Sequence, residues 1–172
     1  MMHKKRKKAI IFTIIGITTV GFLITGVCVM FFHERSTAGI GKSVSDIEYL
    51  SLRLSGMRLS EEYEIVTEGN QAQILYYMFS YADGKEEKIL KKRTFCSTQT
   101  VVEELNRVDF VKWNGFDGKQ PKGVMDGTMF RLCATLNGGQ SLRANGSQNF
   151  PKHFHELEQW LYDMLKDCEE ID

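Results

Sequence analysis

Cysteine is scarce in this chain and is not arranged for metal or redox chemistry. Of four cysteines, Cys28 lies in a long apolar run, which leaves Cys96, Cys133 and Cys168. Three thiols cannot all pair within one chain, and no two have CxxC spacing, so a disulfide framework, a zinc site and a thioredoxin-like pair are not indicated. A bridge between Cys96 and Cys133 stays open. Cys133 and Cys168 are interpreted as small buried residues of a strand and a helix.

The familiar motifs of catalysis are also missing. His153 and His155 are two positions apart, about 200° around a helix, and cannot chelate a metal as HxxxH would. Ser147 lies in Asn-Gly-Ser-Gln-Asn and not in GxSxG, which disfavours a serine hydrolase. The D-x-[DN]-x-[DN]-G spacing of calcium loops is absent. The sequence therefore names no reaction, and we predict no cofactor, no metal and no enzyme activity.

The chain has no excess of basic residues of the kind that nucleic-acid binding requires. It has 22 basic and 22 acidic residues, and five of the basic ones precede Ala9, so the remainder has a net charge of −5. Nucleic-acid binding needs a concentrated basic face and is not expected. The one dense basic patch is interpreted as the solvated face of an edge strand. It consists of Lys88, Lys91, Lys92 and Arg93.

A long run without any charge is the most informative feature that is present. Residues 9–32 would form a helix of about 36 Å, which suffices to cross a hydrocarbon core of about 30 Å. Five basic residues in the tail 1–8 place the N-terminus in the cytoplasm. We predict a single-pass cell-membrane protein whose C-terminal part is extracytoplasmic.

Processing offers alternatives to a permanent anchor. A signal peptide has an apolar core of about 7 to 15 residues, shorter than this run, and the nearest small-residue site lies near Ala38. Cys28 follows Val27, which does not fit a lipoprotein signal, and the run has no acid of the type found in pilin leaders. An uncleaved signal anchor is favoured, and cleavage near Ala38 is left open.

Beyond a small polar linker at 33–45, the pattern predicts one α+β domain over residues 46–172. Period-two segments at 48–55, 61–68, 71–81 and 85–95 are joined by glycine-containing turns, which is typical of an antiparallel meander. The third segment is apolar on both faces and is placed in the middle of the sheet, covered on both sides.

The period then changes to that of a helix, with Thr100 and Glu103 forming a capping box. Segments 128–136 and 140–144 predict a second hairpin, and a stripe from Phe154 to Cys168 predicts a last helix, opened by Asn149 and Pro151. We expect about six strands in the order ββββαββα, with two helices on one face of the sheet.

Three short segments carry an unusual pattern: Trp113-Asn-Gly-Phe116, Asp126-Gly-Thr-Met-Phe130 and Asn145-Gly-Ser-Gln-Asn-Phe-Pro151. The arrangement resembles an uncharacterised family of membrane-anchored or secreted proteins of Gram-positive bacteria, which have W-x-G-F, D-G-T-x-F and N-x-F-P elements in their C-terminal part. The resemblance covers roughly the last 60 residues. It implies a location at the bacterial cell envelope and implies no activity or ligand.

These segments supply the candidate functional loop. Asp117 and Asp126 each precede glycine and are turn formers first, although they could also be calcium ligands or a carboxylate pair for acid-base catalysis. The aromatic residues are interpreted as core before ligand platform. The candidate residues are Trp113, Phe116, Asp117, Asp126 and His153.

Three functions compete. The leading hypothesis is a non-catalytic binding or interaction module outside the membrane, with a protein or small-ligand partner. The first alternative is a small envelope hydrolase with a site around Asp117, Asp126 and His153, and the second is a structural accessory subunit of a membrane complex. An exposed apolar patch of several hundred Å² would favour the accessory subunit.

Overall fold

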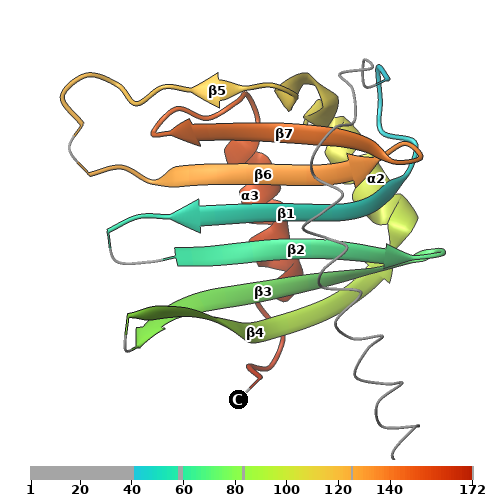
Figure 1. Cartoon of the computed structure of the whole chain (residues 1–172). Helices are drawn as coiled ribbons and strands as arrows, with labels where there is room; N and C mark the ends of the chain where they lie inside the picture. Colours follow the sequence, from blue (N-terminus) through green and yellow to red (C-terminus); the bar gives the residue numbers. More distant parts are fainter. Residues whose placement is uncertain (1–40, 58–59, 83, 125, 172) are drawn as a thin grey trace, which may run out of the picture. The chain divides into compact units, whose positions relative to one another are not determined.

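A computed structural model of the chain describes residues 41–57, 60–82, 84–124 and 126–171. Among these residues the fold is α+β: one seven-stranded, mostly antiparallel sheet has two α-helices on the same face (Figure 1). The strands lie in the order β4-β3-β2-β1-β6-β7-β5. The elements are β1 (Ile47–Ser55), β2 (Ser60–Glu68), β3 (Gln71–Ala82), β4 (Lys85–Ser97), α2 (Thr98–Arg107), η1 (Phe110–Trp113), β5 (Asp117–Gly118), β6 (Met129–Leu136), β7 (Gln140–Ser147) and α3 (Phe154–Leu165).

The first four strands form the predicted meander, because glycines with positive φ close two of its turns. Gly69 has a φ of 59° between β2 and β3, and Gly84 has a φ of 72° between β3 and β4. The prediction that the third strand runs through the middle of the sheet is wrong, since β3 lies next to the edge strand β4. One face of β3 packs under the helices through Ile74, and its other face is not covered by them although Leu75 is buried there.

The second hairpin returns the chain to the centre of the sheet, where β6 pairs antiparallel with β1. A seventh strand, β5, pairs in parallel with β7 through Asp117 and Gly118. The sequence predicted about six strands. A two-residue strand has no periodicity to detect, which explains the missing one.

Helix α2 begins one turn earlier than its predicted capping box. Ser97 is the N-cap, and its hydroxyl accepts a hydrogen bond from the backbone N–H of Thr100 at 3.0 Å. Helix α3 has His153 as its N-cap, with a φ of 65° and no side-chain cap. The helices bury Val101, Leu105 and the row Phe154, Leu157, Leu161 and Leu165 against the even-numbered residues of β1 and β6 in one core.

The domain begins before residue 46, which corrects the predicted end of the linker. Val44 is 3% exposed, and its N–H and C=O both bond the side-chain amide of Asn106 at 2.8 Å. Ser45 donates its N–H to Asn137 Oδ1 at 2.7 Å. The predicted tail 1–8, membrane helix 9–32 and first part of the linker lie outside the described residues. Among the residues that are described, no helix is sufficiently long and apolar to cross a membrane.

Candidate binding groove

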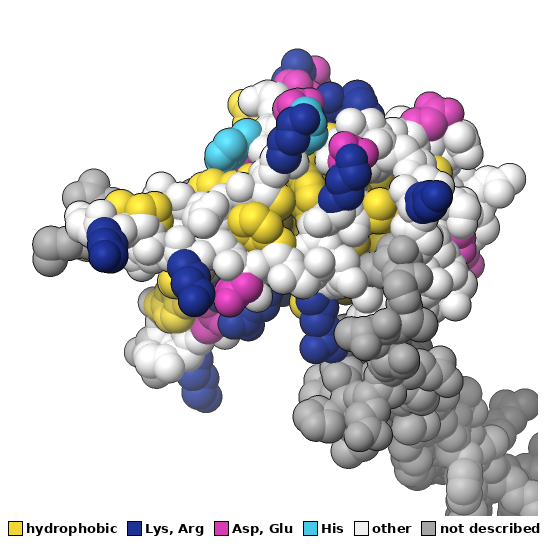
Figure 2. All heavy atoms as spheres, turned by 90° about the horizontal axis from the view of Figure 1, so that it is seen from above, with side chains coloured by type: hydrophobic (Ala, Val, Ile, Leu, Met, Phe, Trp, Pro, Cys, Tyr) yellow, Lys and Arg dark blue, Asp and Glu magenta, His cyan; other side chains and the backbone are white. Residues whose placement is uncertain are grey.

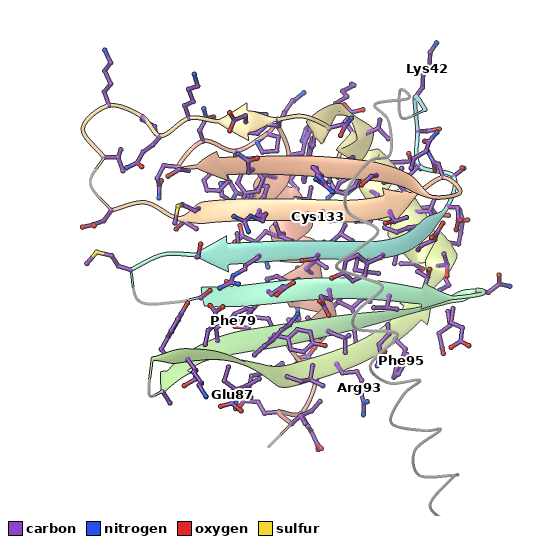
Figure 3. All side chains as sticks on the ribbon, viewed as in Figure 1. Lys42, Phe79, Glu87, Arg93, Phe95 and Cys133 are labelled. Carbon is purple, nitrogen blue, oxygen red and sulfur yellow. The ribbon has the colours of Figure 1, made fainter. Side chains whose placement is uncertain are left out.

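The two faces of the sheet carry different chemistry, and the alternation along β2 shows it. Glu61 and Tyr63 pair with Leu54 and Leu52 and therefore lie on the face that the helices cover. Glu62 and Glu64 point to the opposite face, which we call the open face. Figure 3 views this open face.

A groove of about 570 Å³ lies on the helix side, where α3 crosses the outer strands β2, β3 and β4. Pockets of this size hold small ligands or single peptide side chains. The strands contribute Glu61, Tyr63, Tyr76 and Lys92, and α3 contributes His155, Glu158, Gln159, Tyr162 and Leu165, followed by Lys166.

Two tyrosines form the floor of the groove. The ring centroids of Tyr63 and Tyr76 are 5.1 Å apart, and the rings are tilted by 41°. Tyr76 donates its hydroxyl proton to Glu61 Oε2 at 2.7 Å. Burial, and then the charge of Glu61, raises the pKa of Tyr63, while burial and the bond to Glu61 raise the pKa of Tyr76. Both hydroxyls therefore stay protonated near neutral pH, and that of Tyr76 donates its proton to Glu61.

Ionic side chains form the walls. His155 Nδ1 lies 2.8 Å from Glu158 Oε2, one turn along α3. Lys92 donates from Nζ to the carbonyl oxygen of Lys166 at 3.3 Å, and Lys166 donates to Asp163 Oδ1 at 3.2 Å. Both lysines are therefore drawn towards the C-terminal end of α3.

The open face is different because its charges neutralise one another. Lys88 Nζ lies 3.1 Å from Glu62 Oε2 and 2.7 Å from Glu64 Oε1. Tyr49 donates to Glu64 at 2.9 Å, and Ser51 donates to Glu62 at 2.6 Å. The predicted solvated basic patch is thus divided: β4 is an edge strand and Lys88 lies on the open face, but Lys92 lies in the groove.

Of the sequence-predicted site residues, the two aromatic ones belong to the hydrophobic cluster. Trp113 is 2% exposed, contacts Phe110 and Phe154, and donates its Nε1 proton to the carbonyl oxygen of Lys152 at 3.1 Å. Phe116 is half-buried, 6.2 Å from Phe130 between ring centroids. The interpretation of Trp113 as a core residue is confirmed.

The three polar candidates each have a local setting. Asp117 is exposed on β5 and accepts a hydrogen bond from Asn145 Nδ2 at 2.6 Å. Asp126 is exposed in the connection to β6. His153 Nδ1 lies 2.6 Å from Glu156 Oε1 at the start of α3. Seen from the β5 edge, histidine side chains (cyan) lie near hydrophobic surface (yellow), with separate Lys and Arg side chains (dark blue) on either side of it (Figure 2).

The described part of the chain contains neither a metal centre nor the disulfide between Cys96 and Cys133 that the sequence left undecided. No three His, Cys, Asp or Glu side chains there could hold a metal ion. Cys96, Cys133 and Cys168 are free thiols. Cys96 lies on the helix-covered face of β4 and Cys133 on the open face of β6, four strands away, so the Cys96–Cys133 bridge does not form.

Sequence reasoning did not identify the groove as a site. A signal was present in α3, where His155, Glu158, Gln159, Tyr162 and Lys166 recur at three- and four-residue spacing beside the buried stripe. This second row lies beside the buried stripe of α3 and lines the groove. No protein-family model, curated protein or solved structure matches the chain.

Proposed function

We propose that the α+β domain is a non-catalytic binding module, which residues 9–32 hold at the outer face of a cell membrane. The observation that supports binding is the groove between α3 and strands β2 to β4. It combines three tyrosine rings and Leu165 with charged and polar side chains that converge on one concave surface. Convergent polar groups beside aromatic rings are a common feature of binding sites.

The groups in the groove are suited to recognition. Tyr63 and Tyr76 have raised pKa values and remain protonated. Glu61 accepts the bond from Tyr76, and Glu158 contacts His155. Tyrosine is favoured at binding sites because its ring supplies contact area and its hydroxyl supplies direction at a small cost in conformational entropy.

The membrane part of the proposal is supported by the apolar run and the basic residues that precede it. Its test is the accessibility of a C-terminal tag to protease added outside intact cells or spheroplasts. We expect the tag to be digested and an N-terminal tag to be protected until the membrane is permeabilised. The reverse pattern, or a soluble full-length protein, would overturn this part.

Binding is tested by photocrosslinking from the full-length protein in native membranes. A photoreactive residue at Tyr162, on the rim of the groove, is compared with one at Phe95 on the open face; the two positions are 55% and 53% exposed. We expect reproducible adducts from position 162 that are absent from position 95.

The other outcomes decide between the alternatives. Adducts from position 95 alone would favour the structural accessory subunit, whose partner would cover the open face. No adduct from position 162 would contradict the proposal. A hydrolytic activity of the purified protein that is lost in Asp117→Asn, Asp126→Asn or His153→Gln would replace it with the envelope hydrolase.

A further inference from the structure

Two carboxylates, those of Glu61 and Glu158, line the groove beside the tyrosine pair. Glu61 accepts the hydroxyl proton of Tyr76, and the charges of Glu61 and Glu158 both act on the hydroxyl of Tyr63, after burial, to raise its pKa. Glu170, beyond the end of α3, acts on Tyr76 in the same sense. Of these acids, Glu61 from β2 and Glu158 from α3 line the groove together with the pair of rings.

His155 lies beside Glu158, but in the part of the chain that the structure describes neither lysine of the groove forms a salt bridge with these acids. Lys92 donates to the carbonyl oxygen of Lys166, and Lys166 pairs with Asp163, which is outside the groove lining. The salt bridges of the described residues include none between Glu61 and a lysine or arginine. Glu61 is bonded to Tyr76 through Oε2, and Glu158 is in contact with His155 through Oε2. The second oxygen of each carboxylate and the faces of the rings are left to interact with a ligand.

On the open face of the same sheet, a tyrosine ring and two carboxylates bind an ammonium group. There, Lys88 places its ammonium 4.1 Å from the ring centroid of Tyr77 and within 3.1 Å of Glu62 and Glu64. The ammonium thus receives both a ring face and two carboxylates, which are its preferred partners. The groove offers rings and carboxylates of the same kind, with the lysines directed elsewhere.

We infer that the groove binds an organic cation, namely an ammonium group on an alkyl chain such as a lysine side chain. The inference rests on the proposed function, because it names the ligand class of the same site. Glu61 and Glu158 would accept hydrogen bonds from the ammonium, and Tyr63 and Tyr76 would contact its methylene groups and its charge. Tyr162, which is 55% exposed at the rim, would close over the alkyl chain.

The test uses the full-length protein in detergent micelles and isothermal titration calorimetry. The probes are the peptide acetyl-Gly-Lys-Gly-amide, the diamine cadaverine and the acidic peptide acetyl-Gly-Glu-Gly-amide. We expect the lysine peptide to bind and Glu61→Gln to weaken its binding by about tenfold, as for loss of one charge-assisted hydrogen bond. Glu158→Gln repeats the test at a second position of the groove, on α3, where the side chain is 33% exposed.

Glu64→Gln is the matched control. Glu64 also accepts a tyrosine hydroxyl proton, from Tyr49, and also lies on β2, but on the open face. We expect this variant to bind the lysine peptide as the unchanged protein does. Equal weakening by Glu61→Gln and Glu64→Gln would show that the effect is general charge and not the groove, and would overturn the inference.

The remaining outcomes separate the ligand class from the binding function. Binding of cadaverine as tightly as the peptide would indicate a free amine as the ligand, and binding of the peptide alone would indicate a protein lysine; both support the inference. Binding of the acidic peptide instead would overturn the inference of a cationic ligand. Absence of cation binding, while position 162 still gives photoadducts, would also overturn it. In both cases the proposal of a binding module would stand. If position 162 also gives no adduct, both fail.

Discussion

Gly118 and Gly146 face each other in the parallel pairing of β5 with β7, and neither position has room for a side chain. A Cβ on Gly146 would lie 3.3 Å from the Cα of Gly118 and 2.2 Å from the carbonyl oxygen of Asn149. A Cβ on Gly118 would meet the same oxygen at the same distance. The two glycines thus let the segment before α3 lie directly on the strands, which fixes where α3 begins.

We expect Gly146→Ala to destabilise the domain by about 3 kcal/mol, because the new methyl group must displace backbone and the ring of Phe130, 2.6 Å away. Gly56→Ala is the control, since its Cβ would have only Thr128 Oγ1 at 4.0 Å. Urea unfolding of the full-length protein, followed by tryptophan fluorescence, measures both. Equal stability of the two variants would show that the Asn149 segment can move away at little cost.

Arg107 joins the two helices and gives a prediction on pH. It donates to Glu104 on α2 at 2.8 and 2.6 Å and to Glu156 on α3 at 2.6 Å. His153 and then Arg107 lower the pKa of Glu156 from its usual 4.5. A carboxylate whose pKa is lowered on folding stabilises the fold above its unfolded pKa, and this contribution is lost as the pH falls through the lowered value.

Glu156→Gln should therefore be less stable than the unchanged protein at pH 7, and the difference should shrink below pH 4.5 and vanish in stronger acid. Urea midpoints measured across this range test it. The control is Glu87→Gln, because Glu87 is exposed and belongs to no ion pair of the described residues. A difference that stays constant down to strong acid would mean that the carboxylate charge is not responsible.

Tyr77, on the open face, gives a second prediction on pH, for the alkaline range. Burial, followed by the charge of Glu64, raises the pKa of Tyr77 to about 12. Because the folded pKa is above the unfolded value of 10, the stabilisation is complete below pH 10 and is lost as the pH rises towards 12.

The tyrosinate absorbance of the unchanged protein minus that of Tyr77→Phe should therefore rise only near pH 12 in the folded state. The same difference measured in concentrated urea is the internal control, and it should rise near pH 10. A folded difference that already rises at pH 10 would show that Glu64 and burial do not hold the proton on Tyr77.

The sequence predicted local structure better than it predicted which elements lie side by side in the fold. Alternation along residues 48–55 and glycine at 69 and 84 depend on adjacent residues only, so the meander was predictable. The position of β3 beside the edge depended on β6 returning to β1, which no local pattern encodes. The groove was missed for the same reason, since Tyr63 on β2 and Tyr162 on α3 meet only after α3 has crossed the sheet.

The candidate loop illustrates the same limit. Trp113 and Phe116 were singled out together with Asp117, Asp126 and His153 because the segments that contain them are unusual in sequence. The structure gives the aromatic residues a reason in packing, since Phe130, Phe150 and Phe154 lie with ring centroids 4.7 to 5.5 Å apart beside them. An unusual sequence motif can thus result from close packing around glycine residues as readily as from a catalytic or binding role.

His153 provides the last prediction, because its backbone and its side chain can be tested separately. Its φ of 65° is in the left-handed region, which asparagine tolerates and a β-branched residue does not. His153→Asn and His153→Val both remove the imidazole contact with Glu156, so the difference between them does not come from that contact. We expect the valine variant to be less stable than the asparagine variant by about 1 to 2 kcal/mol. Urea unfolding at one pH measures this, and equal stability of the two would show that α3 can begin at another residue.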